Sequence, residues 1–391
     1  MKIISCYLMP DRSAQDYRKK KEDIEDPVAN TNGEVILADD FNAKGFSKDF
    51  DPCIDEIVSA TLKIHRSAKS NLLPTPCKSH YIFNLRDFSK VIQGVLLSVP
   101  EATEDLNSMR RLWVHEVLRV YHDRLVDEFD KEWFFLLVKQ QIISNMDIKA
   151  EILFERFLGN KIQLERQDLR PLIFCDFTNP KADTRNYIEV QDLDDLRNVV
   201  ETYLVEFNNM SKKPMQLVLF RFSIEHLAKI SRIIKQPRSH ALLIGVGGSG
   251  RQSLTKLAAH ICDYELFQVE LTQQYRAIDW QDNIKNILLK ISSTDTHGVF
   301  LFSDSQAKLE SFLEDINNLL NSGEVPNLFS NEEKVELCEK MKQIDRQRDK
   351  SIQTDGSAAS LYNFFVQVCI IYKTKCFNTI EVVSVLQTDY I

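Results

Sequence analysis

The sequence predicts an α/β protein with a large all-α part, in which helical segments come first and a parallel-sheet core follows. Only 11 of the 391 residues are glycine, well under the ~7% of an average protein, which disfavours turn-dense sandwiches and barrels. Apolar residues between 55 and 160 recur at helical spacing. Between 240 and 302, short apolar runs alternate with helical patterns, which is typical of a parallel sheet.

The composition excludes several classes of function. The chain has 49 basic and 57 acidic residues, a formal charge of -8, so the basic excess typical of nucleic-acid-binding proteins is missing. No apolar run approaches the ~18 residues of a membrane-spanning helix, and the first ten residues are too short a run for a signal peptide. We therefore expect a soluble, intracellular protein with neither a nucleic acid nor a membrane as partner.

The eight cysteines are scattered, with no Cys-x-x-Cys pair. This spacing predicts neither a zinc site nor a dense disulfide framework, and we expect reduced, mostly buried thiols. His80 has no partner at ligand spacing. The sequence therefore predicts no metal site.

The first part of the chain divides into a charged segment and a helical subdomain. Residues 1–54 are dense in charge of both signs and lack a sustained period, so we expect a partly irregular segment. Its basic run, Arg18–Lys21, is followed at once by acidic residues, which favours a solvated face over a nucleic-acid patch. Residues 55–160 are predicted to form the helical subdomain.

Three helical patterns build this subdomain. The first begins at Ile57 and ends before the prolines at 74 and 76. The second covers Asp87–Leu97, and the third, Leu112–Phe135, is the longest periodic run. His115 and Glu116 lie inside the third pattern, where a packing role is favoured over catalysis.

A connector, residues 161–222, follows. Residues 171–190 combine an apolar run with Asn179-Pro180, which predicts an extended piece with a turn. Asp192–Phe207 is predicted to be an amphipathic helix.

Residues 223–391 are predicted to form the α/β core. The expected helices are Ser223–Ile234, Gln252–Cys262 and Trp280–Ile291, and the expected strands are His240–Ile244, Glu265–Leu271 and Val299–Phe302. Two β-branched runs, 366–376 and 380–391, have the composition of further strands. We expect a C-terminally divergent or truncated core, because no helical lid follows the sheet.

Four glycines lie within six residues between the predicted strand and helix. Backbone amides and a helix N-terminus at such a turn hold anions. The P-loop pattern G-x-x-x-x-G-K-[ST] places Lys on the phosphates and a hydroxyl on magnesium. Here Arg251 stands at the Lys position, Gln252 at the hydroxyl position, and Ser253 one residue late. The sequence predicts that phosphate binding survives better than hydrolysis, at Gly245, Val246, Gly247, Gly248, Ser249, Gly250, Arg251, Gln252 and Ser253.

Two other interpretations of this turn stay open. The glycines can simply allow a strand and a helix to pack closely. The same residues also satisfy G-x-G-x-x-G, and Glu270, twenty residues after Gly250, has the spacing of a ribose-binding acid in a dinucleotide fold.

The predicted strand Val299–Phe302 is followed by Ser303, Asp304 and Ser305. This resembles a Walker B strand, in which an Asp holds magnesium and a following Glu orients the attacking water. Asp304 is present, but Ser305 stands where the Glu is expected and has no carboxylate. Alternatively, Asp304 caps the next element.

These motifs resemble the axonemal dynein heavy chains. HALLIGVGGSGRQSLTKLAAHICDYELFQVELT, VFLFSDSQ and SFLEDINNLLNSGEVPNLF are similar to the fourth AAA+ module of that family. LLPTPCKSHYIFNLRDFSKVIQGVLL and LWVHEVLRVYHDRL are similar to the small subdomain that closes the third module. The resemblance covers about 55–365 and implies a fragment or short isoform of the motor ring, with a helical AAA+ lid-like subdomain followed by an incomplete P-loop AAA+ core.

The family's residue roles carry over only at matching positions. Arg86 corresponds to the sensor arginine of the third module's lid, and Gly245–Ser253 and Asp304 to the fourth module's Walker elements. The large subdomain of the third module is missing, and the sequence departs from the family from about Cys369. The resemblance implies bound ATP or ADP, with or without Mg²⁺, and a chain that is not an autonomous ATPase.

The resemblance also implies partners and a location. The partners are other AAA+ modules of a dynein heavy chain, dynein intermediate and light chains, and, indirectly, microtubules. The location is the cytoplasm, the cytoskeleton and the ciliary axoneme. A dinucleotide-binding oxidoreductase and an interaction module without a ligand remain the alternatives.

Overall fold

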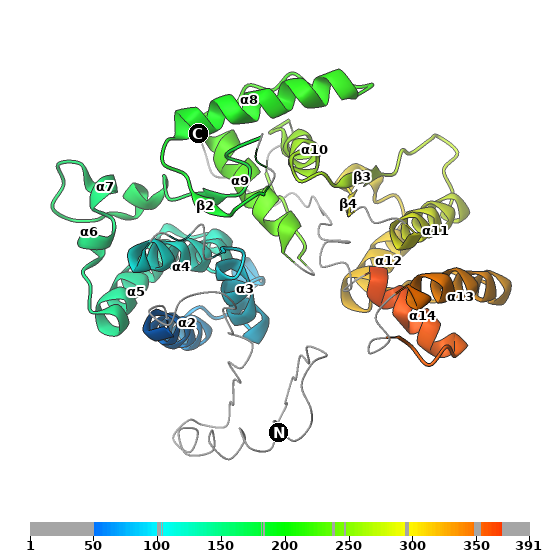
Figure 1. The fold of residues 1–391 in the computed structure, drawn as a ribbon, viewed down its shortest axis with the longest axis horizontal. Coiled ribbons are helices and arrows are strands. Elements are labelled where there is room, and N and C mark those ends of the chain that lie inside the picture. The colour runs from blue at the N-terminus through cyan, green and yellow to red at the C-terminus, as the bar shows by residue number, and fades with distance from the viewer. Residues whose placement is uncertain are drawn as a thin grey trace, which may run out of the picture.

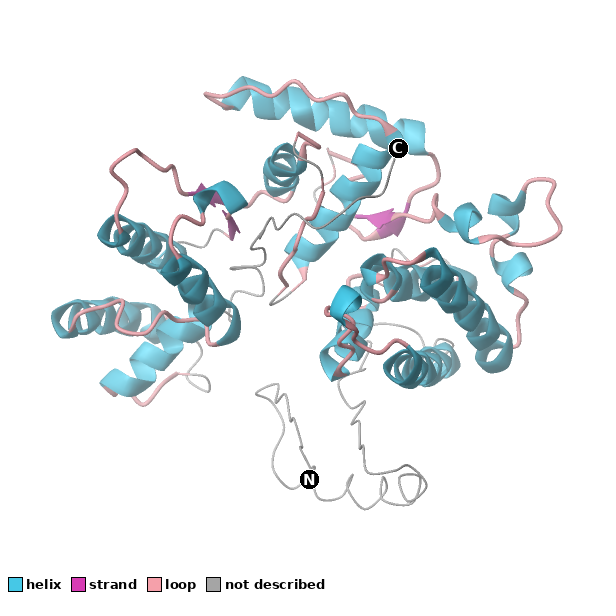
Figure 2. Ribbon diagram, turned by 180° about the vertical axis from the view of Figure 1, so that it is seen from behind, coloured by secondary structure: helices cyan, strands magenta, loops and turns pink. Residues whose placement is uncertain are grey.

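The computed structural model describes residues 51–99, 103, 105–180, 182, 184–236, 239–245, 248–293, 297–347 and 353–369. Helices dominate these residues, and the few strands are short (Figures 1 and 2). The predicted charged segment lies outside the described part up to residue 50, and its last four residues already belong to the first helix. Among the described residues, no helix combines the length and the apolarity needed to cross a membrane.

Four long helices build the helical subdomain around one core that includes Ile57, Trp113 and Phe134. Helix α2 packs on α5, and α3 packs on α4. At the start of α3, the Asn84 side chain accepts from the Arg86 N–H, and Asp87 accepts from the Asn84 N–H at 2.9 Å. This capping box explains why the helix begins there. The helices are α2 (Asp51–Asn71), α3 (Leu85–Val95), α4 (Leu106–Val120), α5 (Glu128–Met146), and the short α6 (Ala150–Leu153) and α7 (Glu155–Leu158).

The long periodic run Leu112–Phe135 is two helices, because α4 ends at Val120 and α5 begins at Glu128. Tertiary contacts hold the break between them. Arg124 donates to Asp87 at 2.8 Å and to the Ile82 carbonyl, and the Tyr81 hydroxyl accepts from the Val126 N–H. The Tyr81 hydroxyl thereby pairs the Val126 N–H, which a continuous helix would have paired internally, and periodicity alone could not show the interruption.

The connector begins with an antiparallel pair, β1 (Phe174–Cys175) and β2 (Ile188–Glu189), in the register Phe174↔Glu189. This confirms the predicted extended piece with a turn. Helix α8 (Leu193–Met210) follows and is capped by the Asp192 side chain on the Asp194 N–H.

The α/β part contains α9 (Arg221–Lys235), α10 (Arg251–Ile261), β3 (Glu265–Gln268), α11 (Ala277–Ser293) and β4 (Gly298–Leu301). Strands β3 and β4 pair in parallel, from Glu265↔Gly298 to Gln268↔Leu301. Helix α10 packs on α9 and on both strands. The predicted helices and the parallel order of these two strands are confirmed.

The predicted strand His240–Ile244 is wrong. Within the described residues it joins no ladder, and β3 and β4 pair only with each other. Leu242 and Ile244 are 55% and 48% exposed instead of buried. A strand forms only where a neighbouring strand pairs with it, and an apolar sequence alone does not show whether such a neighbour exists.

The described chain ends in helices. After the 3-10 turn η6 (Asp304–Gln306) come α12 (Glu310–Asn321), α13 (Asn331–Arg346) and α14 (Ala358–Gln367), which share a core with β4 and α11. The β-branched run from 366 starts inside α14 and a π-turn at 368–369, so its first residues are not a strand. The rest of that run and residues 380–391 lie outside the described residues.

Candidate functional site

Two described glycines of the loop, Gly248 and Gly250, adopt backbone conformations that favour glycine. Gly248 and Gly250 have φ of +83° and +78°, in the left-handed region that a side chain disfavours. Gly250 is the N-cap of α10, and no side chain caps that helix. The first amides of α10 are therefore open to an anion, as in other phosphate-binding loops. Val246 and Gly247, also predicted for the site, lie outside the described residues.

The predicted phosphate contact, Arg251, is the first residue of α10 and turns back on the loop. Its Nη1 donates to the carbonyl oxygen of Gly245, six residues earlier. A Cβ placed on Gly245 would lie 3.2 Å from this Nη1 and 3.4 Å from the Ser249 Oγ. Gln252 and Ser253 are half-buried in the first turn of α10.

The segment after β4 differs from a Walker B site in its chemistry. Asp304 starts η6, and its side chain is outside the described atoms. Ser305 bonds the neighbouring Ser303 through their hydroxyls at 3.0 Å, and the Ser303 N–H donates to Gln306 at 2.7 Å. The element that follows β4 is η6, which begins at Asp304 itself, and the N-cap of the next helix, α12, is Leu309.

Glu270 is the acid that the dinucleotide interpretation assigns to the ribose. It lies two residues beyond β3, with a side chain that is 80% exposed and paired with Lys213 at 2.8 Å. Arg86 lies in the first turn of α3, exposed to solvent, and its backbone N–H takes part in the cap of that helix. The structure records no contact between Arg86 and the described part of the glycine loop.

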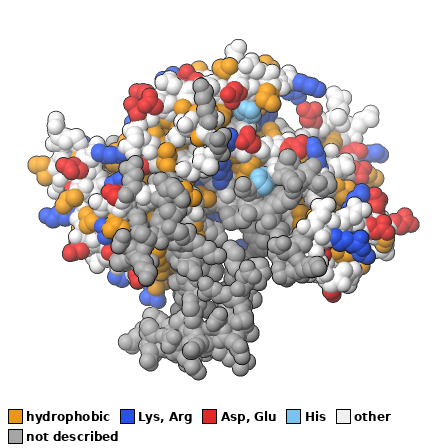
Figure 3. Space-filling model, in the orientation of Figure 1, with side chains coloured by type: hydrophobic (Ala, Val, Ile, Leu, Met, Phe, Trp, Pro, Cys, Tyr) orange, Lys and Arg blue, Asp and Glu red, His pale blue; other side chains and the backbone are white. Residues whose placement is uncertain are grey.

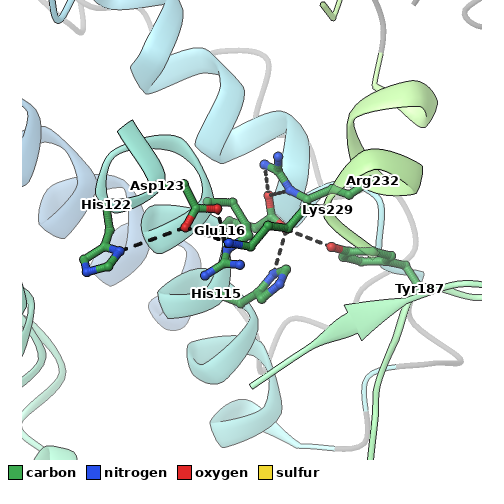
Figure 4. Close-up of polar contacts among 8 residues, drawn as sticks. His115, Glu116, His122, Asp123, Tyr187, Lys229 and Arg232 are labelled. Atoms are coloured by element: carbon green, nitrogen blue, oxygen red, sulfur yellow. Dashed lines mark hydrogen bonds and ion pairs between the residues drawn. The ribbon is translucent and has the colours of Figure 1, made fainter. Parts of the chain in front are cut away.

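A buried charge network joins the helical subdomain to the α/β part (Figure 4). Glu116 of α4 is completely buried, and Arg232 of α9 donates to it through Nε at 2.8 Å and also through Nη2. The Tyr187 hydroxyl donates to the same carboxylate at 3.0 Å, and His115 lies 3.1 Å from it. The packing role predicted for His115 and Glu116 is confirmed.

The charge states in this network follow from burial and from the ion pair. Burial alone would raise the pKa of Glu116, but the Arg232 guanidinium outweighs it and lowers the pKa to about 2. Burial lowers the pKa of His115 to about 4, so its ring is neutral at pH 7. One buried anion thus faces one buried cation, and the carboxylate accepts hydrogen bonds from both sides.

A second ion cluster lies further along the same interface (Figure 4). Asp123 lies 3.3 Å from Arg119 and 3.2 Å from Lys229 of α9. Burial would raise the pKa of Asp123, but these two cations lower it. Arg232 and Lys229 could not be predicted from the sequence, because they lie more than 100 positions from their partners and carry no local signal.

Two cavities of about 380 and 530 Å³ share the connector residues Asp176 and Arg185 in their walls. Glycine-loop residues line neither of them. Among the described residues, no group of three or more His, Cys, Asp or Glu is arranged to hold a metal ion. The six described cysteines are free thiols, four of them buried.

Comparisons with known proteins identify the family. Residues 215–372 match the family described as the P-loop containing dynein motor region D4, and residues 57–154 match the AAA+ lid domain. Dynein axonemal heavy chain 3 of Mus musculus is 46% identical over 331 residues, which is 85% of this chain and 8% of the relative. The Homo sapiens protein of that name is 45% identical over 324 residues, 83% of this chain and 8% of the relative.

A third relative, dynein axonemal heavy chain 1 of Homo sapiens, is 42% identical over 288 residues, 74% of this chain and 6% of the relative. The chain thus spans less than a tenth of the length of these relatives. Both matched segments are parts of P-loop AAA+ proteins, a nucleotide-binding class. The chain therefore belongs to the axonemal dynein heavy chain family, as a homologue of its AAA+ lid and P-loop motor region D4.

Proposed function

We propose that this chain works as part of a dynein heavy chain motor ring in microtubule-based movement of cilia and flagella. The observation that carries the proposal is the D4 match over 215–372, which contains the glycine turn leading into α10. The proposed partners are other AAA+ modules of the ring, dynein intermediate and light chains and, through the ring, microtubules. The proposed location is the cytoskeleton of the axoneme, within the cytoplasm.

At the site itself, we propose that ADP or ATP binds at Gly245–Ser253 and serves a structural or regulatory role with little hydrolysis. The glycine conformations and the uncapped start of α10 suit a phosphate. Asp304 keeps its proposed place at the Walker B position, and Arg86 its proposed role as a sensor arginine.

The residues around the loop do not suit bound magnesium. P-loops hold this ion through a Ser or Thr hydroxyl next to the Lys and through a Walker B acid. Gln252 offers an amide instead of the hydroxyl. Ser253 lies one residue on, so its Cα is turned about 100° around the helix axis. The described donor set thus supports phosphate binding better than metal binding.

Calorimetry on the whole chain with ADP, ATP and NAD tests this proposal. We expect heat of binding with the adenine nucleotides and none with NAD. Binding of NAD together with no binding of ADP would favour the dinucleotide alternative, and no binding of any of the three would favour an interaction module.

A phosphate-release assay tests the absence of hydrolysis. We expect negligible turnover, because Ser305 cannot act as a general base. The triple change Arg251→Lys, Gln252→Thr and Ser305→Glu should still give little turnover, since AAA+ sites also draw on a lid and on an arginine from the neighbouring module. Rapid phosphate release by the unmodified chain would contradict the proposal.

A further inference from the structure

The contact between Arg251 and Gly245 ties the two ends of the glycine loop together. The guanidinium starts from the first residue of α10, and its Nη1 reaches the carbonyl oxygen of Gly245 where the loop begins. Its Nη1 would lie 3.2 Å from a Cβ on Gly245, a tight contact that a shift of the guanidinium by a few tenths of an ångström would relieve. We call this contact the loop staple.

The chemistry of arginine allows the staple and phosphate binding at the same time. A guanidinium carries five N–H donors and keeps its charge at any physiological pH. With Nη1 on Gly245, the Nε and Nη2 groups make no hydrogen bond to a described residue and can donate to phosphate oxygens. A lysine ammonium at the same position is a compact point charge without this planar fork.

The loop staple and the lack of a hydroxyl at position 252 together bear on how magnesium takes part in the proposed nucleotide binding, on which this inference rests. In a P-loop, magnesium bridges the phosphates and the hydroxyl that follows the lysine. Here Gln252 replaces that hydroxyl, while Arg251 already links both ends of the loop. We propose that Arg251 organises this loop and binds the phosphates in place of a Lys–Mg²⁺ pair, so that ADP binds independently of magnesium.

The test compares ADP affinity by calorimetry in excess Mg²⁺ and in EDTA, using the whole chain. The unmodified chain should give dissociation constants that agree within about twofold. Arg251→Ala should weaken binding about tenfold or more under both conditions, because it removes a hydrogen bond to a charged group. The double change Arg251→Lys, Gln252→Thr should restore dependence on magnesium, with binding about tenfold tighter when the ion is present.

Two further variants serve as controls for Arg251→Ala. Gly245→Ala keeps every charge and shifts Nη1 by only a few tenths of an ångström, so it should change ADP binding much less than Arg251→Ala does. Lys256→Gln removes a cation from the second turn of the same helix and should leave the affinity unchanged. Thermal melting of each variant checks that the fold is intact.

Amide hydrogen exchange of the chain without nucleotide tests the loop staple directly. The amides of Gly248–Gly250 should exchange faster in Arg251→Ala than in the unmodified chain, and at the unmodified rate in Lys256→Gln. If ADP does not bind the unmodified chain, the proposed function fails, while exchange still tests the staple. If ADP binds but magnesium tightens it about tenfold or more, or if Arg251→Ala leaves exchange unchanged, the inference is overturned.

Discussion

At the scale of single residues, the ion pair of Glu116 and Arg232 is central to the interface between the helical subdomain and the α/β part. Both are more than nine-tenths buried, and each is the other's counter-ion. A buried ion pair adds little net stability compared with apolar residues in its place. A buried charge that has lost its partner, however, strongly destabilises the fold. Replacing one of the two residues should therefore lower the stability of the protein much more than replacing both.

We expect Arg232→Leu to lower the free energy of unfolding by about 3–5 kcal/mol, because it leaves the Glu116 carboxylate buried without its cation. The double change Arg232→Leu, Glu116→Leu should recover a large part of this loss. Urea unfolding of the three proteins measures it. Equal losses in the single and double variants would show that shape, not charge, dominates at this position.

His115 gives the same network a dependence on pH. Its folded pKa of about 4 lies below the ordinary 6.5, because burial disfavours the charged ring. The unfolded chain therefore binds a proton that the folded chain resists, and stability falls as the pH drops from 6.5 toward 4. Glu116, whose folded pKa of about 2 lies below the ordinary 4.5, loses its stabilisation progressively as the pH falls from about 4.5 to about 2.

We expect His115→Gln to remove up to about 3 kcal/mol of the stability difference between pH 7 and pH 4. Chemical unfolding at several pH values, compared with the unmodified chain, measures this difference. His240 and His226, whose pKa values are also lowered by burial, stay in both proteins and cancel in the comparison. Parallel pH profiles for the two proteins would contradict the assignment.

At the scale of elements, the packing of α3 on α4 depends on Gly94. A Cβ on Gly94 would lie 1.7 Å from the Glu116 Oε2, far inside contact distance. Glycine in a helix interior costs about 0.5–1 kcal/mol relative to alanine, so its presence in α3 needs a tertiary reason. The reason is the close approach of the buried carboxylate to the α3 backbone.

Gly94→Ala should therefore destabilise the protein by about 2–4 kcal/mol, because it displaces Glu116 from Arg232. This loss is expected even though alanine has the higher helix propensity. Ser89→Ala, at an exposed position of the same helix, is the matched control and should change stability little. Thermal unfolding of both variants provides the measurement. A stabilised Gly94→Ala protein would mean that Glu116 moves freely.

At the scale of the whole molecule, charges of both signs are interspersed on the face drawn in Figure 3. Among the described residues, α5 carries a row of exposed apolar side chains. Phe129, Leu136 and Ile143 are 80%, 55% and 51% exposed. Their seven-residue spacing places them on one face of the helix. In contrast, helices α3 and α4 bury most of their large apolar residues.

We expect the isolated chain to self-associate through the α5 face, because exposed apolar patches are interaction sites or aggregation liabilities. Sedimentation should show mass above that of a monomer. The triple change Phe129→Ser, Leu136→Ser, Ile143→Ser should reduce association, while the same change at exposed positions Glu332, Glu336 and Lys340 of α13 should not. A monomer that binds no hydrophobic dye would contradict this expectation.

Local sequence was sufficient for features that depend on neighbours along the chain. Helical periodicity predicted α2, α3 and α8–α11, and the glycine cluster predicted the turn before α10, since backbone preferences act over a few residues. The same motifs pointed to the family. The break between α4 and α5 escaped prediction, because it is held by Tyr81 and Asp87 from another segment.

The tertiary structure alone decided the remaining features. Whether His240–Ile244 joins a sheet depends on a neighbouring strand, and the pairing of Glu116 with Arg232 spans 116 positions. Burial then set the charge states of His115 and Glu116. At the candidate site, the sequence was sufficient to predict which residue types are present. Only the folded loop showed that the Arg251 guanidinium contacts Gly245, because the direction of a side chain follows from packing and hydrogen bonding.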